Sequence, residues 1–61
     1  DPTITFNLGV LQAMQGKLDV AIDQCKQALT DASGILRESM LDSLNHPTIP
    51  KKLRDALSNF S

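Results

Sequence analysis

Apolar residues recur along this chain at intervals of three and four, the spacing that places side chains on one face of an α-helix. Short apolar series close to the C-terminus follow the same spacing as those near the start. The strict alternation typical of a half-buried β-strand does not occur after Leu8. The pattern therefore predicts an all-α chain. The longest series is Leu8, Leu11, Met14, Leu18, Ala21, Cys25, Ala28, Ala32 and Ile35.

Glycine and proline residues divide this pattern into segments. Asp1 followed by Pro2 is a favourable start for a first helix, because Asp caps and Pro suits the first turn. Gly16, Ser33-Gly34 and the segment 45–50, which holds Pro47 and Pro50, mark three breaks. These breaks predict about four short antiparallel helices in one small domain, 1–61. Their expected ranges are 3–15, 18–32, 35–45 and 50–60, arranged as a helix-turn-helix at 1–33 and a second pair at 34–61.

One long helix is an alternative. The apolar spacing continues through Gly16, so a helix from about 5 to 45 that folds back at 46–50 also accounts for it. Gly16 and Gly34 would then each cost about 1 kcal/mol inside a helix.

The charge and composition exclude several classes of partner. The chain has 61 residues, six Lys or Arg against seven Asp or Glu, and a net charge of −1. Nucleic-acid binding depends on accumulated positive charge and on aromatic side chains, and Phe6 and Phe60 are the only aromatics. No apolar run approaches the roughly 18–20 residues that cross a bilayer. We therefore expect neither nucleic-acid binding nor membrane insertion, and one unpaired cysteine favours a cytoplasmic location.

Candidate catalytic chemistry is sparse. Cys25 and His46 are the only conceivable nucleophile and base, and Cys25 falls on an apolar helix face where a buried thiol is inert. His46, just before Pro47, is expected to be a capping or solvated turn residue. We predict no enzyme, no metal site, no cofactor and no small-molecule substrate. Pro47-Thr48-Ile49-Pro50 has the spacing of a polyproline ligand, but a helix connection explains it better.

The segment Thr5–Ala32 resembles a tetratricopeptide repeat, a helix-turn-helix unit of about 34 residues. The resemblance implies that Gly9 and Ala21 are small where two helices cross and that Gly16 permits the turn. It also implies that Leu8, Ile22 and Leu29 fill the seam between the helices. The family usually places a large aromatic residue where this chain has Thr5, Gln12, Leu18 and Cys25, and a proline where it has Ser33. Residues 34–61 do not repeat the pattern.

In this family the first helix of each unit lines a groove that holds a peptide or a partner helix. The residues that the resemblance places there are Phe6, Asn7, Val10, Ala13 and Met14. Phe6, Val10 and Met14 also suit a simple core role. Lys51, Lys52 and Arg54 form a second, basic candidate surface.

A repeat unit buries its core against neighbours, so one and a half units predict a missing protein partner. We expect a protein-interaction module or a fragment of a helical-repeat scaffold that binds through an apolar helical face. The alternative is a structural subunit of a homo- or hetero-oligomeric helical assembly.

Overall fold

The computed structural model describes residues 1–58, which form four α-helices and no strand. The helices are α1 (Pro2–Met14), α2 (Leu18–Asp31), α3 (Gly34–Ser43) and α4 (Lys51–Leu57). The prediction of an all-α chain with four helices is confirmed. Phe60, expected at the end of the last helix, lies outside the described residues.

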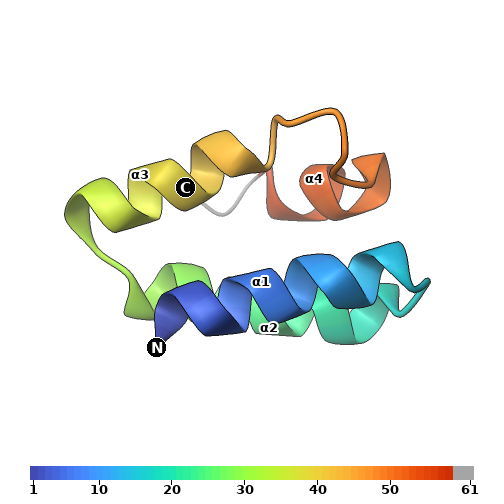
Figure 1. The fold of residues 1–61 in the computed structure, drawn as a ribbon, viewed down its shortest axis with the longest axis horizontal. Helices are drawn as coiled ribbons and strands as arrows, with labels where there is room; N and C mark the ends of the chain where they lie inside the picture. The colour runs from blue at the N-terminus through green and yellow to red at the C-terminus, as the bar shows by residue number, and fades with distance from the viewer. Residues whose placement is uncertain (59–61) are drawn as a thin grey trace.

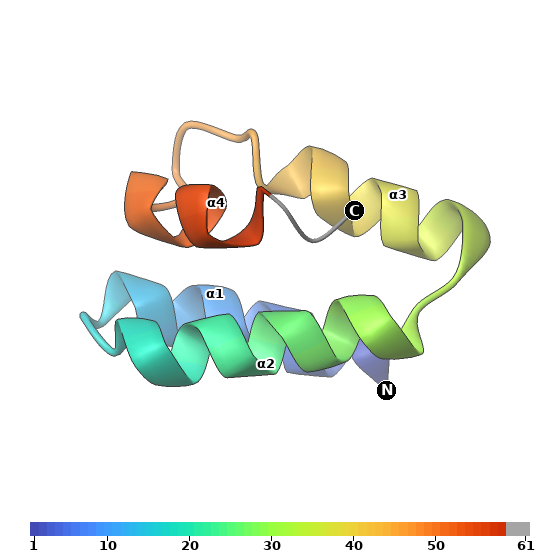
Figure 2. The ribbon, with the colours of Figure 1, turned by 180° about the vertical axis from the view of Figure 1, so that it is seen from behind.

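The helices form two layers (Figure 1). One layer is the hairpin of α1 and α2, and the other contains α3 and α4, which lie above it. Helices α1 and α3 run in the same general direction, and α2 and α4 run in the opposite one. Seen from behind, α2 lies in front of α1, and α4 lies over α2, against which it packs (Figure 2).

The start of α1 follows the sequence closely. The Asp1 side chain accepts a hydrogen bond of 3.0 Å from the backbone N–H of Thr3, and Pro2 occupies the first turn. Asp1 therefore satisfies one of the free N–H groups of the helix start, and Pro2 has no N–H that needs a partner. Ser33 stands in the corresponding place before α3, but its side chain makes no capping hydrogen bond.

The chain reverses at Gly16, so the alternative of one long helix is wrong. Gly16 has φ +84°, a left-handed conformation that residues with a Cβ rarely adopt. The N–H of Gly16 donates to the Ala13 carbonyl at 3.1 Å, and the N–H of Lys17 donates to the Gln12 carbonyl at 2.9 Å. This pair of bonds is the Schellman arrangement that ends a helix at a left-handed residue.

Replacing Gly16 with L-alanine is expected to lower the free energy of unfolding by about 1–2 kcal/mol, because Ala resists the left-handed conformation. A Cβ at this position meets no atom within 4 Å, so the loss is conformational rather than steric. D-alanine at position 16 is the matched control, since it adopts positive φ without strain. Chemical denaturation of the synthetic chains measures both. Stabilisation by L-alanine would contradict the hairpin.

The two helices of the hairpin approach each other closely because small residues line their crossing. A Cβ built on Gly9 would lie 2.6 Å from Cys25 Sγ and 3.1 Å from the Ala21 carbonyl oxygen. Ala21, Cys25 and Ala28 are fully buried along the facing side of α2. The close crossing expected at Gly9 and Ala21 is therefore present.

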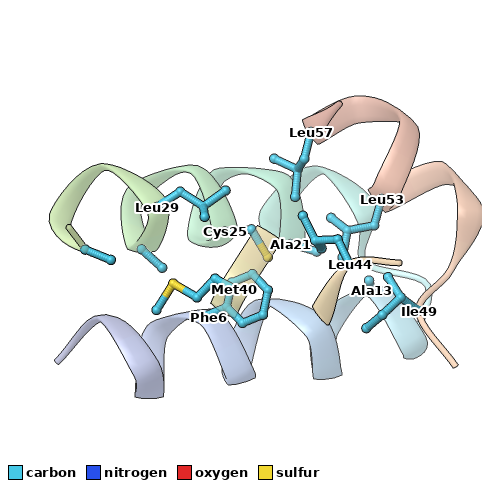
Figure 3. Close-up of a cluster of buried hydrophobic side chains, with 12 residues drawn as sticks. Phe6, Ala13, Ala21, Cys25, Leu29, Met40, Leu44, Ile49, Leu53 and Leu57 are labelled. Carbon is cyan, nitrogen blue, oxygen red and sulfur yellow. The ribbon is translucent and has the colours of Figure 1, made fainter. Parts of the chain in front are cut away.

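Larger side chains fill the space between the two layers (Figure 3). Leu29, Leu53 and Leu57 are the largest fully buried side chains of the described residues, and they lie where α2 packs against α4. Phe6 from α1 and Met40 from α3 meet in the same core. The complete set of buried apolar residues is Phe6, Ala13, Ala21, Cys25, Ala28, Leu29, Ala32, Met40, Leu44, Ile49, Leu53 and Leu57.

Not every residue of the longest apolar series enters this core. Leu8 is 43% exposed, so the prediction that it fills the seam of the hairpin is wrong. Leu11, Met14 and Ile35 are also exposed. Leu29 is fully buried and Ile22 packs against the core, as expected for the seam.

Candidate functional site

A hollow of about 210 Å³ lies between α1 and α3, and the loop before α4 contributes to its lining. Helix α3 is held to the core through Met40, while Ile35 and Leu36 near its start remain exposed. The first part of α3 therefore does not close onto α1, which leaves a groove between the two helices. The lining residues of this α1–α3 groove are Thr3, Phe6, Asn7, Val10, Leu36, Ser39, Met40, Ser43 and Ile49.

The groove has an apolar floor and a polar rim. Phe6, Met40 and Ile49 are at most 7% exposed and form its inner surface. Asn7, Thr3 and the serines Ser39 and Ser43 are exposed residues of the lining. None of the described residues that line the hollow is charged. The groove is therefore suited to an uncharged group that buries apolar surface and hydrogen-bonds at its edge.

Three of the five residues predicted for a binding groove line this hollow. Phe6, Asn7 and Val10 occupy successive positions along its α1 wall. Ala13 is buried in the core, and Met14 is 52% exposed outside the hollow. Phe6 belongs to both the core and the groove floor. The sequence left open whether Phe6 is a core residue or a groove residue, and in the structure it is both.

The opposite wall of the groove was not predicted from the sequence. Its residues come from α3 and the following loop, because the second layer places Leu36, Ser39, Met40 and Ser43 across from α1. The spacing of Leu36, Met40 and Leu44 predicted a helix face, but not the helix that it would meet.

The second candidate surface divides into exposed and structural residues. Lys51 and Lys52 are exposed at the start of α4. Arg54 is half-buried, and its Nε donates to the Leu44 carbonyl at 2.7 Å. Its Nη2 donates to the Ile49 carbonyl at 3.3 Å and to the His46 carbonyl at 3.4 Å. Arg54 therefore fastens the loop between α3 and α4 in addition to carrying positive charge.

Replacing Arg54 with methionine is expected to lower the free energy of unfolding by about 1–2 kcal/mol, because bonds from a charged donor to carbonyls are lost. Thermal and urea denaturation measure the loss. Lys52→Met is the matched control, since Lys52 is exposed two residues earlier in α4 and its change should be close to neutral. Equal stability of the two variants would show that the carbonyl bonds of Arg54 contribute nothing.

A second hollow of about 300 Å³ lies beside Arg54, between the end of α3 and α4. Leu41, Leu44 and Leu57 form its apolar part, and Asn45 and Ser58 its polar part. Of the described residues that line it, Arg54 alone is charged, and its guanidinium is already bonded to backbone carbonyls. This hollow thus offers less free polar chemistry than the α1–α3 groove.

Cys25 and His46 do not form a catalytic pair. Cys25 is fully buried, and burial raises the pKa of its thiol to about 11. His46 is exposed in the loop, where its Nδ1 accepts a hydrogen bond from the Thr48 N–H at 3.2 Å and lies 2.9 Å from Thr48 Oγ1. Among residues 1–58, no group of His, Cys, Asp or Glu is arranged to hold a metal ion.

The raised pKa of Cys25 makes the stability of the fold depend on pH. The unfolded thiol loses its proton near pH 9, whereas the folded thiol keeps it until about pH 11. The folded state therefore binds more protons in this window, and the free energy of unfolding is expected to fall as pH rises from 9 to 11. Urea denaturation at several pH values measures this decrease. Cys25→Ala should show a shallower decrease, and an unchanged slope would contradict the assignment.

A separate apolar surface lies on α1, away from the core. Ile4 is 67% exposed, Leu11 is 52% exposed and Leu8 is 43% exposed, at positions that share one helix face. We call these three residues the outer stripe. The sequence contains a signal for it, since residues 2–16 carry no charge and α1 has apolar residues all round. Such a helix is typically buried on more than one side.

Within residues 1–58, no helix is both long and apolar enough to span a bilayer. Comparison with known protein families, with curated protein sequences and with solved structures found no match for this chain.

Proposed function

We propose that this chain is a protein-interaction module whose α1–α3 groove binds an apolar, uncharged segment of another protein. The observation that carries the proposal is the lining itself. Its floor is Phe6, Met40 and Ile49, its rim carries hydroxyl and amide groups, and within residues 1–58 no charged residue borders it. A ligand with ionised groups would find no partner for its charge there.

The size of the groove favours a side chain of a peptide over a free small molecule. Its volume of about 210 Å³ is below the roughly 300–1,000 Å³ of small-molecule pockets. Its α1 wall extends from Thr3 to Val10, about two turns of helix, which is long enough for one or two apolar side chains of a bound chain. Asn7, exposed on the α1 wall, is placed to bond the backbone of such a chain.

The resemblance of Thr5–Ala32 to a tetratricopeptide repeat supports the same proposal. In that family the first helix lines a peptide groove, and Phe6, Asn7 and Val10 are among the residues that the resemblance assigns to it. These three residues line the α1 wall of the hollow. The chain then acts as a tetratricopeptide-like scaffold element that works in the cytoplasm by binding and has no catalytic chemistry of its own.

Selection from a random peptide library tests this function. We expect the immobilised chain to enrich uncharged peptides with one or two large apolar residues. Fluorescence anisotropy with an enriched peptide should show binding about tenfold weaker or more for Ser39→Arg, which places a charge on the exposed rim. Asn7→Ala should also weaken binding, with little loss of stability.

Glu38→Arg is the matched control, because Glu38 is exposed on α3 beside Ser39 but does not line the groove. Its effect on peptide affinity should be small. Enrichment of peptides rich in charged residues would contradict the groove as the binding site. So would a peptide affinity that Ser39→Arg leaves unchanged.

A further inference from the structure

A short connection joins the two layers of the fold (Figure 2). It consists of Ala32 and Ser33, which are extended, and Gly34, which begins α3 with φ +58°. We call residues 32–34 the hinge. Short connections between packed segments allow two copies of a chain to exchange identical elements. From the hinge and the core that it joins, we infer that two copies exchange their second layers, so that α3 and α4 of each copy pack on the hairpin of the other.

The core of the monomer specifies what covers each hairpin in such a dimer. Leu53 and Leu57 of α4 and Met40 of α3 are buried against the hairpin, where they belong to one cluster with Phe6 and Leu29. A second copy carries the same side chains in the same order. The exchanged layer therefore makes the contacts that the structure already shows, and the conformation of the hinge is what changes.

Both helix ends that meet at the hinge lack the usual stabilising groups. The Ser33 side chain makes no capping hydrogen bond at the start of α3. Asp31 is the last residue of α2, and a carboxylate at the C-terminal end of a helix opposes the helix dipole. If α2 and α3 joined into one helix, the free backbone groups of both ends would bond to each other. Asp31 would then lie in a helix interior, away from a helix end.

The spacing of the core residues fits such a continuous helix. Leu29, Leu36 and Met40 are seven and four residues apart, so they would share one face of a helix that runs through the hinge. Both halves of this helix would then present their core side chains on the same side. A two-fold axis at the hinge places α3 of one copy antiparallel to α2 of the other, as α3 runs relative to α2 in the monomer (Figure 1).

The exchange also explains the exposure of Ile35. This residue is 84% exposed in the monomer, although it follows Ala28 and Ala32 at helical spacing. In a continuous helix Ile35 would share the face of these two alanines. Because the two hinges cross at the axis, Ile35 of each copy would pack against the helix of the other copy.

The α1–α3 groove is kept in the exchanged dimer but is divided between the copies. Its α1 wall, with Asn7 and Val10, belongs to one copy. Its α3 wall, with Ser39 and Ser43, belongs to the other. Each dimer then has two grooves, and each groove is complete only when both copies are present. The exchange itself does not depend on whether the groove binds a peptide.

Replacing Gly34 with L-alanine tests the role of the hinge. Alanine resists the positive φ of the monomer and favours a helix through the hinge, and its Cβ meets no atom within 4 Å. The starting chain should be mainly monomeric at micromolar concentration and form dimers toward millimolar concentration. Sedimentation equilibrium under reducing conditions should show that Gly34→Ala raises the association constant about a hundredfold or more, since each dimer has two hinges.

D-alanine at position 34 is the matched control, because it retains positive φ and disfavours the continuous helix. It should not increase dimerisation. If dilute Gly34→Ala is unfolded, its helical circular dichroism should return as the concentration rises and dimers form. A Gly34→Ala chain that stays monomeric up to millimolar concentration, whether folded or unfolded, would overturn the inference.

An isotope-filtered NMR experiment distinguishes exchange from side-by-side association. Phe6 of the hairpin and Met40 of α3 meet in one core (Figure 3). Dimers refolded from an equal mixture of labelled and unlabelled Gly34→Ala chains should show a nuclear Overhauser effect between Phe6 of one copy and Met40 of the other. Dimers without this signal would overturn the exchange. Peptide affinity is measured separately, so failure of this inference is distinguishable from failure of the proposed function.

Discussion

Replacing Gly9 with leucine is expected to abolish the folded state of this chain. The first atom of any side chain at position 9 would lie 2.6 Å from Cys25 Sγ and 3.1 Å from the Ala21 backbone oxygen. The thiol can shift, but the backbone of α2 cannot move without separating the hairpin. Overpacking by even one or two methylene groups costs about 1–3 kcal/mol, and leucine adds four carbon atoms. Circular dichroism and thermal denaturation measure the loss.

Smaller changes at the same crossing give a graded test. Gly9→Ala should lose less stability than Gly9→Leu. Alanine has a higher helix propensity than glycine, by about 1 kcal/mol, and this gain offsets part of the steric cost. Removing the facing thiol with Cys25→Ala should reduce the penalty of Gly9→Ala, so the double variant should be less destabilised than the sum of the single ones. If Gly9→Leu folded with unchanged stability, α1 and α2 would not cross at this position.

Replacing Leu53 with alanine is expected to produce the second largest loss. Leu53 is fully buried where α4 packs on α2. Removing a buried leucine side chain typically costs about 2–5 kcal/mol, through lost burial and the cavity left behind. A single core in a chain this short rarely supplies more than about 3–5 kcal/mol of stability. The expected loss is therefore close to the whole stability of the fold. Urea denaturation is expected to show that a large share of the Leu53→Ala molecules is already unfolded at room temperature before urea is added.

Lys52→Ala is the matched control for Leu53→Ala. Lys52 is the preceding residue of α4 and is exposed, so its truncation leaves the core intact. We expect its unfolding free energy to stay within about 0.5 kcal/mol of the starting chain. A similar small effect for Leu53→Ala would mean that α4 contributes little to the stability of the fold.

The helices and their breaks were predictable because each is encoded locally. The Asp1–Pro2 start, the Gly16 turn and the proline-containing connection each depend on residues within a few positions of one another. Spacing alone did not reveal which apolar face would be buried. Leu8 belongs to the same periodic series as Ala21 and Cys25, but it lies on the side of α1 that faces away from both α2 and the second layer.

The candidate groove was only half predictable for the same physical reason. Phe6, Asn7 and Val10 were identified from local resemblance, whereas Leu36, Ser39 and Met40 reach the groove through the stacking of two hairpins. The role of Arg54 also depends on tertiary structure, since its carbonyl partners lie five to ten residues earlier in the chain. The spacing of residues in the sequence does not predict contacts of this kind, which form only when the chain folds back on itself.

The central claim is that the α1–α3 groove binds an apolar, uncharged segment of another protein. The most direct test is a titration of the isotopically labelled chain with a peptide enriched from the random library, followed in amide NMR spectra. We expect the amide signals of Asn7, Val10 and Ser39, which line the groove, to move as peptide is added, while those of Lys51 and Lys52 on α4 stay fixed. Groove signals that remain unchanged at a peptide concentration that saturates binding would contradict the claim.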